Sequence, residues 1–190
     1  MNAPPFCRRL ALTAVLLGTG ALAHGESPVV NLRGAVLCLD PGSVRMNLGD
    51  TPAGRRAGLQ QVGGGLGRLV TAVLRAGGVP HETRPSCRAS GAATQVVLDV
   101  RYLDPRHYVG FGDPAYSYML SLQVGPGAGR PTPAAAKTTA IQFSSVWSDI
   151  HSESRTGQPV AKMLTALGRT QAQDLVRAWR KENPGRGVGP

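Results

Sequence analysis

The sequence predicts an α+β fold: a two-layer sandwich with a mostly antiparallel sheet of about four to five strands and two helices on one face. Three observations lead to this prediction. Segments 59–74 and 160–179 place apolar residues at the three- and four-residue spacing of an amphipathic helix. Other segments alternate apolar and polar residues, as half-buried strands do, and Pro- and Gly-rich connections separate them. The 190 residues are enough for one domain with a real hydrophobic core.

The first expected elements are a strand and a helix. Residues 34–39 form an apolar run typical of a buried strand, and Asp40-Pro41-Gly42 ends it. A connection rich in Gly, Arg and Asn precedes the helix. Inside the helical pattern, Gly63-Gly64-Gly65 costs roughly 1 kcal/mol per glycine relative to alanine. We therefore expect a firm helix only from Leu66, ended by Gly77-Gly78.

The middle of the chain predicts strands. After a short strand at 79–84, alternating runs at 96–103, 116–124 and 139–150 indicate consecutive antiparallel strands. The Gly- and Pro-rich segment 125–137 connects two of them, and we expect it to be a mobile loop.

The last element is a helix. Pro159 suits its first turn, and its apolar stripe extends to Trp179. Asn183-Pro184-Gly185 ends the helix, and we expect 184–190 to be a disordered tail.

The N-terminus predicts export. Two arginines precede an apolar stretch at 10–22, and Ala21-Leu22-Ala23 fits the small-x-small cleavage rule. This order predicts a signal peptide at 1–23, and the apolar stretch is short for a membrane span, which needs about 20 residues. A retained anchor is the alternative. We expect a periplasmic or extracellular protein with a single α+β domain at 24–183 and no transmembrane segment after cleavage.

The net charge of +10 does not by itself indicate a nucleic-acid partner. Of the 21 basic residues, 18 are Arg and 3 are Lys, and they are spread thinly rather than gathered in a cluster or a basic helix face. We expect instead a modest attraction to anionic polymers of the cell envelope, weakening with salt. No cofactor is predicted.

Cys38 and Cys87 are the two cysteines that follow the predicted signal peptide. In an oxidising compartment they are candidates for one disulfide. The alternative is that Cys38 is a buried strand residue with no bond to Cys87, and sequence does not decide between the two.

The N-terminal third resembles a known family. Residues 37–42 (LCLDPG) resemble the first-strand motif of zinc-dependent N-acetylmuramoyl-L-alanine amidases, and 58–61 and 83–84 resemble two further segments of that family. The resemblance implies descent from a cell-wall hydrolase with a zinc site.

The residues at the family's ligand positions differ from its ligands. Ser43 stands where the resemblance places one histidine, and Arg101 or a neighbour within 100–103 stands where it places the other; Gln61 stands where it places a glutamate. A hydroxyl, a guanidinium and an amide do not make a zinc site, which needs imidazole, thiolate or carboxylate ligands. The resemblance therefore implies that the metal ligands have been lost.

The order of elements is also similar to that of small bacterial envelope α+β domains, such as those of curli-secretion and Tol-assembly proteins. This second resemblance implies assembly or scaffolding work rather than catalysis.

Asp149, His151 and Glu153 are candidate ligands of a different metal site. These residues would share one face if the segment is extended, and oxygen and nitrogen ligands suit a divalent ion. The alternative, which the many serines nearby favour, is a solvated strand end.

A binding surface is the remaining candidate. Tyr108 and Phe111 lie in a Pro- and Gly-bounded loop, with Arg106 beside them and Arg101 on the preceding strand. Aromatic rings beside arginines can stack on sugar rings or dock a protein partner. We expect an exported, non-enzymatic binding or interaction module of the envelope, with an anionic envelope polymer or another envelope protein as its partner. The alternatives are an amidase-like cell-wall hydrolase or its degenerate, inactive relative, and a purely structural secreted domain.

Overall fold

The computed structural model describes residues 31–88, 92–126 and 141–186 and has the α+β fold that the sequence predicts. The elements along the chain are β1 (Leu37–Leu39), the 3-10 turn η1 (Pro41–Ser43), β2 (Val44–Asn47), α1 (Ala53–Ala76), β3 (His81–Thr83), β4 (Ala93–Leu103), β5 (Ala115–Gly125), β6 (Phe143–His151), α2 (Glu153–Thr156) and α3 (Val160–Glu182).

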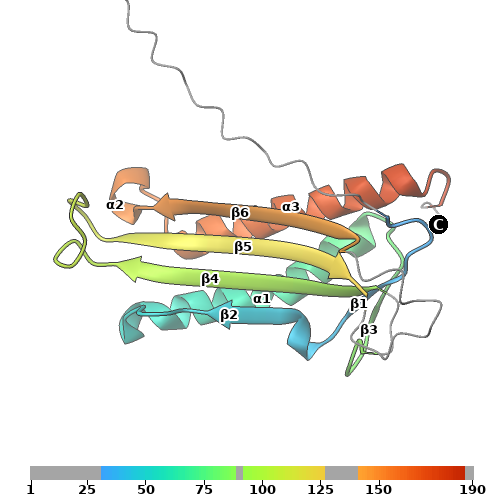
Figure 1. Ribbon diagram of the computed structural model, residues 1–190, viewed down its shortest axis with the longest axis horizontal. Coiled ribbons are helices and arrows are strands. Elements are labelled where there is room, and N and C mark those ends of the chain that lie inside the picture. The colour runs from blue at the N-terminus through green and yellow to red at the C-terminus, as the bar shows by residue number, and fades with distance from the viewer. Residues whose placement is uncertain (1–30, 89–91, 127–140, 187–190) are drawn as a thin grey trace, which may run out of the picture.

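The sheet is larger than predicted and mixed. The described residues form six strands, in the order β3-β1-β4-β5-β6, with β2 also paired to β4 (Figure 1). The predicted antiparallel meander is confirmed as β4–β5–β6, and these long strands make the sheet mostly antiparallel. The shorter pairs β1–β3, β1–β4 and β2–β4 are parallel.

Strand β2 was missed by the sequence analysis. Its four residues, Val44–Asn47, lie inside what was expected to be an irregular connection. They alternate between half-buried and exposed positions, and they pair in register with residues 96–99 of β4. A run this short gives no local signal, so the pairing with a distant strand decides its conformation.

The expected late start of the first helix is wrong, because α1 is continuous from Ala53. Gly63 lies against the side chain of Met46 on β2, and a Cβ at Gly63 would overlap that thioether. The helix therefore approaches β2 more closely than an alanine would allow. Tertiary packing compensates for the poor helix propensity of the glycines.

The two long helices share one hydrophobic core with the sheet. The core side of β4 carries Val96, Leu98 and Val100, which alternate with less buried residues on the other side. Helices α1 and α3 also contact each other, and a Cβ at Gly168 of α3 would lie 2.7 Å from Leu66 Cδ2 of α1. Both helices run along the sheet (Figure 1).

Asn183, at the end of α3, ties the two ends of the described chain together. Its side-chain amide donates to Leu32 O at 2.8 Å and to Trp179 O at 2.9 Å, and its Oδ1 accepts from Gly34 N at 2.6 Å. The residue is 5% exposed, so these bonds replace those that water would make.

Three predicted segments lie wholly or partly outside the described residues: the signal peptide 1–23, the loop 125–137 and the tail 184–190. Within the described part of the chain, no helix has the length and apolar character needed to cross a membrane.

Candidate functional site

The loop between β4 and β5 has a defined shape that Asp104 organises. Its carbonyl oxygen accepts from His107 N at 2.9 Å and Tyr108 N at 3.1 Å. Its carboxylate accepts from Arg106, with Oδ1 bound to the backbone N at 2.9 Å and Oδ2 to the guanidinium at 2.5 Å. The Arg106 hydrogen bonds hold the pKa of Asp104 well below its usual range.

Of the four predicted binding residues, three lie in this loop. Tyr108 and Phe111 are half-buried, and Arg106 is exposed. Arg101 is also exposed. It lies on β4 next to the core residue Val100, so its side chain projects from the face of the sheet that points away from the core.

A cluster that the sequence analysis missed lies at the base of the loop. Arg55, in the first turns of α1, donates to the Tyr116 hydroxyl at 3.0 Å and to Glu153 Oε2 at 2.7 Å. Its guanidinium carbon lies 5.9 Å from the ring centroid of Tyr102 and 6.0 Å from that of Tyr116. The two rings pack edge to face at 5.5 Å.

The charges of this cluster affect one another. Burial raises the pKa of Tyr116, and the hydrogen bond from Arg55 acts against that rise. The same hydrogen bond raises the pKa of Arg55. The cluster therefore holds a guanidinium on two aromatic faces, with Glu153 as its partial counter-charge.

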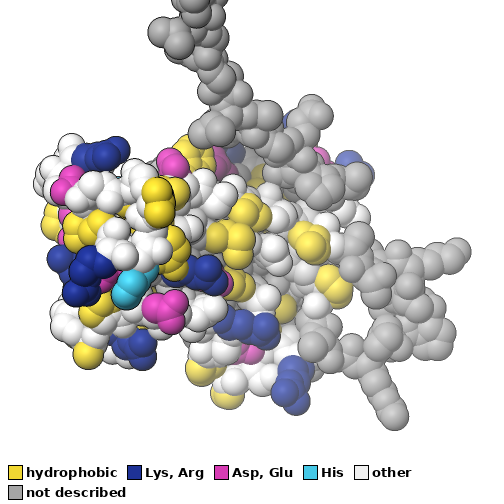
Figure 2. All heavy atoms as spheres, turned by 60° about the vertical axis from the view of Figure 1, so that its left-hand side comes forward, with side chains coloured by type: hydrophobic (Ala, Val, Ile, Leu, Met, Phe, Trp, Pro, Cys, Tyr) yellow, Lys and Arg dark blue, Asp and Glu magenta, His cyan; other side chains and the backbone are white. Residues whose placement is uncertain are grey.

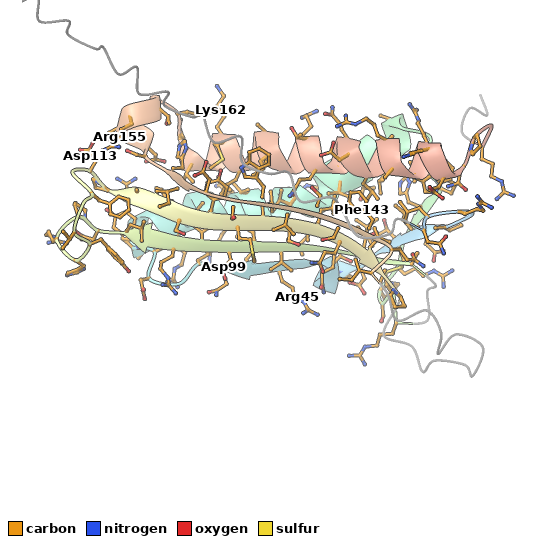
Figure 3. The ribbon with its side chains drawn as sticks, turned by 45° about the horizontal axis from the view of Figure 1, so that its top comes forward. Arg45, Asp99, Asp113, Phe143, Arg155 and Lys162 are labelled. Atoms are coloured by element: carbon orange, nitrogen blue, oxygen red, sulfur yellow. A yellow bond between two sulfur atoms is a disulfide. The ribbon has the colours of Figure 1, made fainter. Side chains whose placement is uncertain are left out.

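We name this part of the molecule the aromatic end. The loop connects the end of β4, one residue after Tyr102, to the start of β5, one residue before Tyr116, so it lies next to the cluster. Figure 2 shows this end of the molecule, where Lys and Arg side chains gather with hydrophobic side chains between them. Asp113 of the loop and Arg155 of α2 lie at the same end (Figure 3). The residues of the aromatic end are Arg55, Tyr102, Arg106, Tyr108, Phe111, Tyr116 and Glu153.

The structure does not build the metal site considered at Asp149, His151 and Glu153. The segment is extended only as far as His151, and Glu153 begins α2. Glu153 Oε1 accepts from Val160 N at 2.8 Å, and Oε2 accepts from Arg55. His151 is buried and its Nε2 lies 2.7 Å from Gln158 O. In the described parts of the chain, no three His, Cys, Asp or Glu side chains are grouped so that they could hold a metal ion.

The three positions compared with amidase ligands are not brought together either. Ser43 lines a cavity beside η1, and Gln61 lines a different groove between α1 and α3. Arg101 lines neither of these two. The residues present at these positions therefore do not fit a zinc ion, in either chemistry or placement.

Cys38 and Cys87 form a disulfide, with their Cα atoms 5.7 Å apart. Both residues are buried, and the structure has the disulfide rather than an unbonded Cys38. The bond joins β1 to the segment that follows β3.

Comparisons with known proteins identify no family for this chain. No protein-family model and no curated protein matches this chain. A PelC dodecamer structure from Paraburkholderia phytofirmans is 13% identical, with a TM-score of 0.41, over 76% of this chain and 89% of that one. A neuraminyllactose-binding hemagglutinin homolog from Helicobacter pylori is 9% identical, with a TM-score of 0.46, over 83% of this chain and 89% of that one. The function therefore has to be argued from this chain's own side chains.

Proposed function

We propose that this protein is an exported, non-enzymatic binding module of the cell envelope, and that its aromatic end binds an anionic polysaccharide. The observation that carries the proposal is the Arg55 guanidinium held between Tyr116, Tyr102 and Glu153 at the base of an ordered aromatic loop. In this proposal the helices form one layer and the sheet the second, and the binding surface lies at one end of this two-layer sandwich.

The chemistry of the aromatic end suits a charged sugar polymer. Tyr108 and Phe111 are half-buried, so each ring is anchored in the loop while part of it stays in contact with solvent. Apolar sugar faces pack on such rings, and sugar carboxylates or sulfates pair with a neighbouring guanidinium. Arg106 is suitable for this role because its side chain is 82% exposed even though it is bonded to Asp104.

The charge of the chain supports the same ligand class. Removal of the predicted signal peptide takes away Arg8 and Arg9, which changes the net charge from +10 to 10 − 2 = +8. A positive surface raises the local concentration of a polyanion, and the effect falls with ionic strength. We therefore expect binding that combines ring stacking with a salt-dependent component.

The test is a binding measurement on protein purified after export from the full-length chain. A Tyr108→Ala/Phe111→Ala double variant is compared with the wild type for retention on an anionic polysaccharide such as polygalacturonate. Val109→Ala is the matched control, because Val109 lies between Tyr108 and Phe111 in the sequence and is fully exposed. We expect the double variant to bind at least about tenfold more weakly, consistent with the loss of two ring contacts.

The result separates this proposal from its competitors. Unchanged melting temperature in both variants shows that the fold is intact. Equal binding by the double variant and the wild type, or capture of a single envelope protein in place of polysaccharide, overturns the proposal. Absence of any binding supports the purely structural domain instead.

An inactive relative of the cell-wall amidases is the second candidate, because the elements in the resembling region are formed in the corresponding order. Strand β1 is followed by the turn at Asp40, the short strand β2, helix α1 and strand β3, which is parallel to β1. Stoichiometric zinc together with peptidoglycan cleavage by the purified protein would favour an active hydrolase and contradict our first proposal.

A further inference from the structure

The cavity beside η1, which Ser43 lines, lies at the other end of β4, away from the aromatic end. Its volume is about 610 Å³, and it is bounded by η1, the start of β2, the segment 85–88 and the first residues of β4. This size is in the range of small-molecule sites. None of the residues proposed above to bind polysaccharide lines it.

The charged side chains in its wall leave an excess of positive charge. Among the lining residues that the structure describes, two are positively charged, Arg45 and Arg88, and one is negatively charged, Asp40. Within that part of the chain, neither arginine takes part in a salt bridge.

The carboxylate of Asp40 forms hydrogen bonds with residues of the cavity wall rather than with Arg45 or Arg88. Its Oδ2 accepts from Cys87 N at 2.7 Å, and its Oδ1 accepts from the Ser43 hydroxyl at 3.1 Å. The backbone hydrogen bond from Cys87 is the main reason that the pKa of Asp40 is lowered. The carboxylate thus stays ionised and holds segment 85–88 against η1.

Arg45 is positioned without being neutralised. With the amide of Gln95 in the orientation that satisfies both groups, its oxygen accepts from Arg45 Nε at 3.2 Å and Nη2 at 3.1 Å. A neutral amide orients the guanidinium and leaves its charge and its remaining N–H groups available. Figure 3 shows Arg45 on the side of the sheet away from α3, and its side chain is exposed.

The opposite wall supplies a second cation and a hydroxyl. Ser86 Oγ accepts from Arg88 N at 3.3 Å, which leaves the hydroxyl proton of Ser86 free to be donated. The disulfide between Cys38 and Cys87 fixes this wall to β1. Two guanidinium groups and one hydroxyl thus line the same cavity from walls that the disulfide and Asp40 hold together.

We propose that this cavity binds a phosphate group, with Arg45 and Arg88 as the cationic contacts and Ser86 as a hydroxyl donor. Two guanidinium groups match the charge and multiple oxygens of a phosphate dianion better than those of a single carboxylate. The volume leaves room for an organic group attached to the phosphate. A free phosphate ion and a phosphate ester on a larger molecule share this chemistry, and the experiment separates them.

The experiment is calorimetric titration of the purified, oxidised protein with inorganic phosphate, glycerol 3-phosphate and acetate at low ionic strength. Arg45→Gln and Arg88→Gln each remove one proposed contact. Arg68→Gln is the control, because Arg68 is an exposed residue of α1 that does not line the cavity and its substitution removes the same charge. A thermal shift with saturating phosphate is a second measurement on the same variants.

We expect saturable phosphate binding that each cavity variant weakens about tenfold or more and Arg68→Gln changes less than about twofold, as for loss of one charge-assisted hydrogen bond. Tighter binding of glycerol 3-phosphate identifies an ester as the ligand, whereas tighter binding of inorganic phosphate identifies the free ion. Equal affinity for acetate, an equal effect of Arg68→Gln, or no saturable binding of either phosphate overturns the proposal.

This inference does not depend on the proposed function. The Tyr108→Ala/Phe111→Ala variant should bind phosphate as the wild type does, and Arg45→Gln should bind polysaccharide as well as Arg68→Gln does. Failure of one site is therefore distinguishable from failure of the other.

Discussion

Arg55 on α1 donates a 3.0 Å hydrogen bond to the hydroxyl of Tyr116 on β5, and this contact joins the first helix to the middle of the meander. The ring of Tyr116 is buried at 2% exposure, while the side chain of Arg55 is 46% exposed. The bond therefore lies at the boundary between the core and the solvent-facing surface of the aromatic end.

The first prediction concerns the ionisation of Tyr116. Burial raises the pKa of Tyr116 above its ordinary value of 10.0, and Arg55 reduces that rise by hydrogen bonding and by its charge. Arg55→Gln should therefore raise the pKa of Tyr116 further, because the phenolate loses its cation. Ultraviolet titration of the phenolate, with Tyr116→Phe to assign the signal, measures this change.

The same shift predicts a loss of stability at high pH. Since the pKa of folded Tyr116 is raised, the folded state releases this proton at a higher pH than the unfolded state does. Its contribution is fully present below the unfolded pKa and is lost as pH rises through the folded pKa. Tyr116→Phe should flatten the fall in unfolding free energy above pH 10.0; an unchanged slope would contradict this assignment.

The second prediction concerns Asn183. Asn183→Ala removes three hydrogen bonds near the buried end of α3, and the carbonyl of Leu32 keeps the hydrogen bond from Ala35 N but loses the one from Asn183, so we expect the free energy of unfolding to fall by about 2–4 kcal/mol. Asn47→Ala is the control, because the hydrogen bonds of Asn47 are exposed and their loss should cost less than about 1 kcal/mol. Urea denaturation measures both, and similar values for the two variants would show that the tie at Asn183 contributes little.

The third prediction uses neighbouring glycines in α1. Gly64→Ala should raise the free energy of unfolding by about 0.5–1 kcal/mol, because a Cβ there meets nothing within 4 Å and the helix propensity improves. Gly63→Ala gains the same propensity but must displace the Met46 thioether, so we expect it to be less stable than Gly64→Ala by at least about 1 kcal/mol. Equal stabilities by thermal unfolding would mean that Met46 moves aside without loss of packing.

The fourth prediction concerns the disulfide. Cys38 and Cys87 are 49 residues apart, and closing a loop of that length contributes up to about 4 kcal/mol in the chain-entropy model. The Cys38→Ser/Cys87→Ser variant should lose about 2–4 kcal/mol of stability relative to the oxidised wild type. Reducing agent should lower the melting temperature of the wild type and leave the variant unchanged, and a matching response in both would rule out this explanation.

The part of the fold that could be predicted is the part that is determined by local pattern. The β4–β5–β6 meander alternates apolar and polar residues over long runs, and α3 carries a long apolar stripe that ends near Trp179. Each of these signals lies within one segment, so it could be recognised before the partners of that segment were known.

The part that could not be predicted depends on partners distant in sequence. β2 is a strand because β4 lies beside it, and α1 continues through Gly63-Gly64-Gly65, where Gly63 packs against Met46 of β2. The predicted aromatic loop was placed correctly in the chain, but the Arg55 cluster beneath it draws on four separate elements and has no local motif.

The sequence by itself determined the class of fold, the meander and the last helix, because side-chain periodicity over a long segment selects the face that is buried. Tertiary structure alone decided that Cys38 meets Cys87, that Arg55 meets Tyr116, and that Arg45 and Arg88 line one cavity. These contacts join residues of different elements, so they depend on how the elements pack against one another. The residue pattern within a single segment carries no information about that packing.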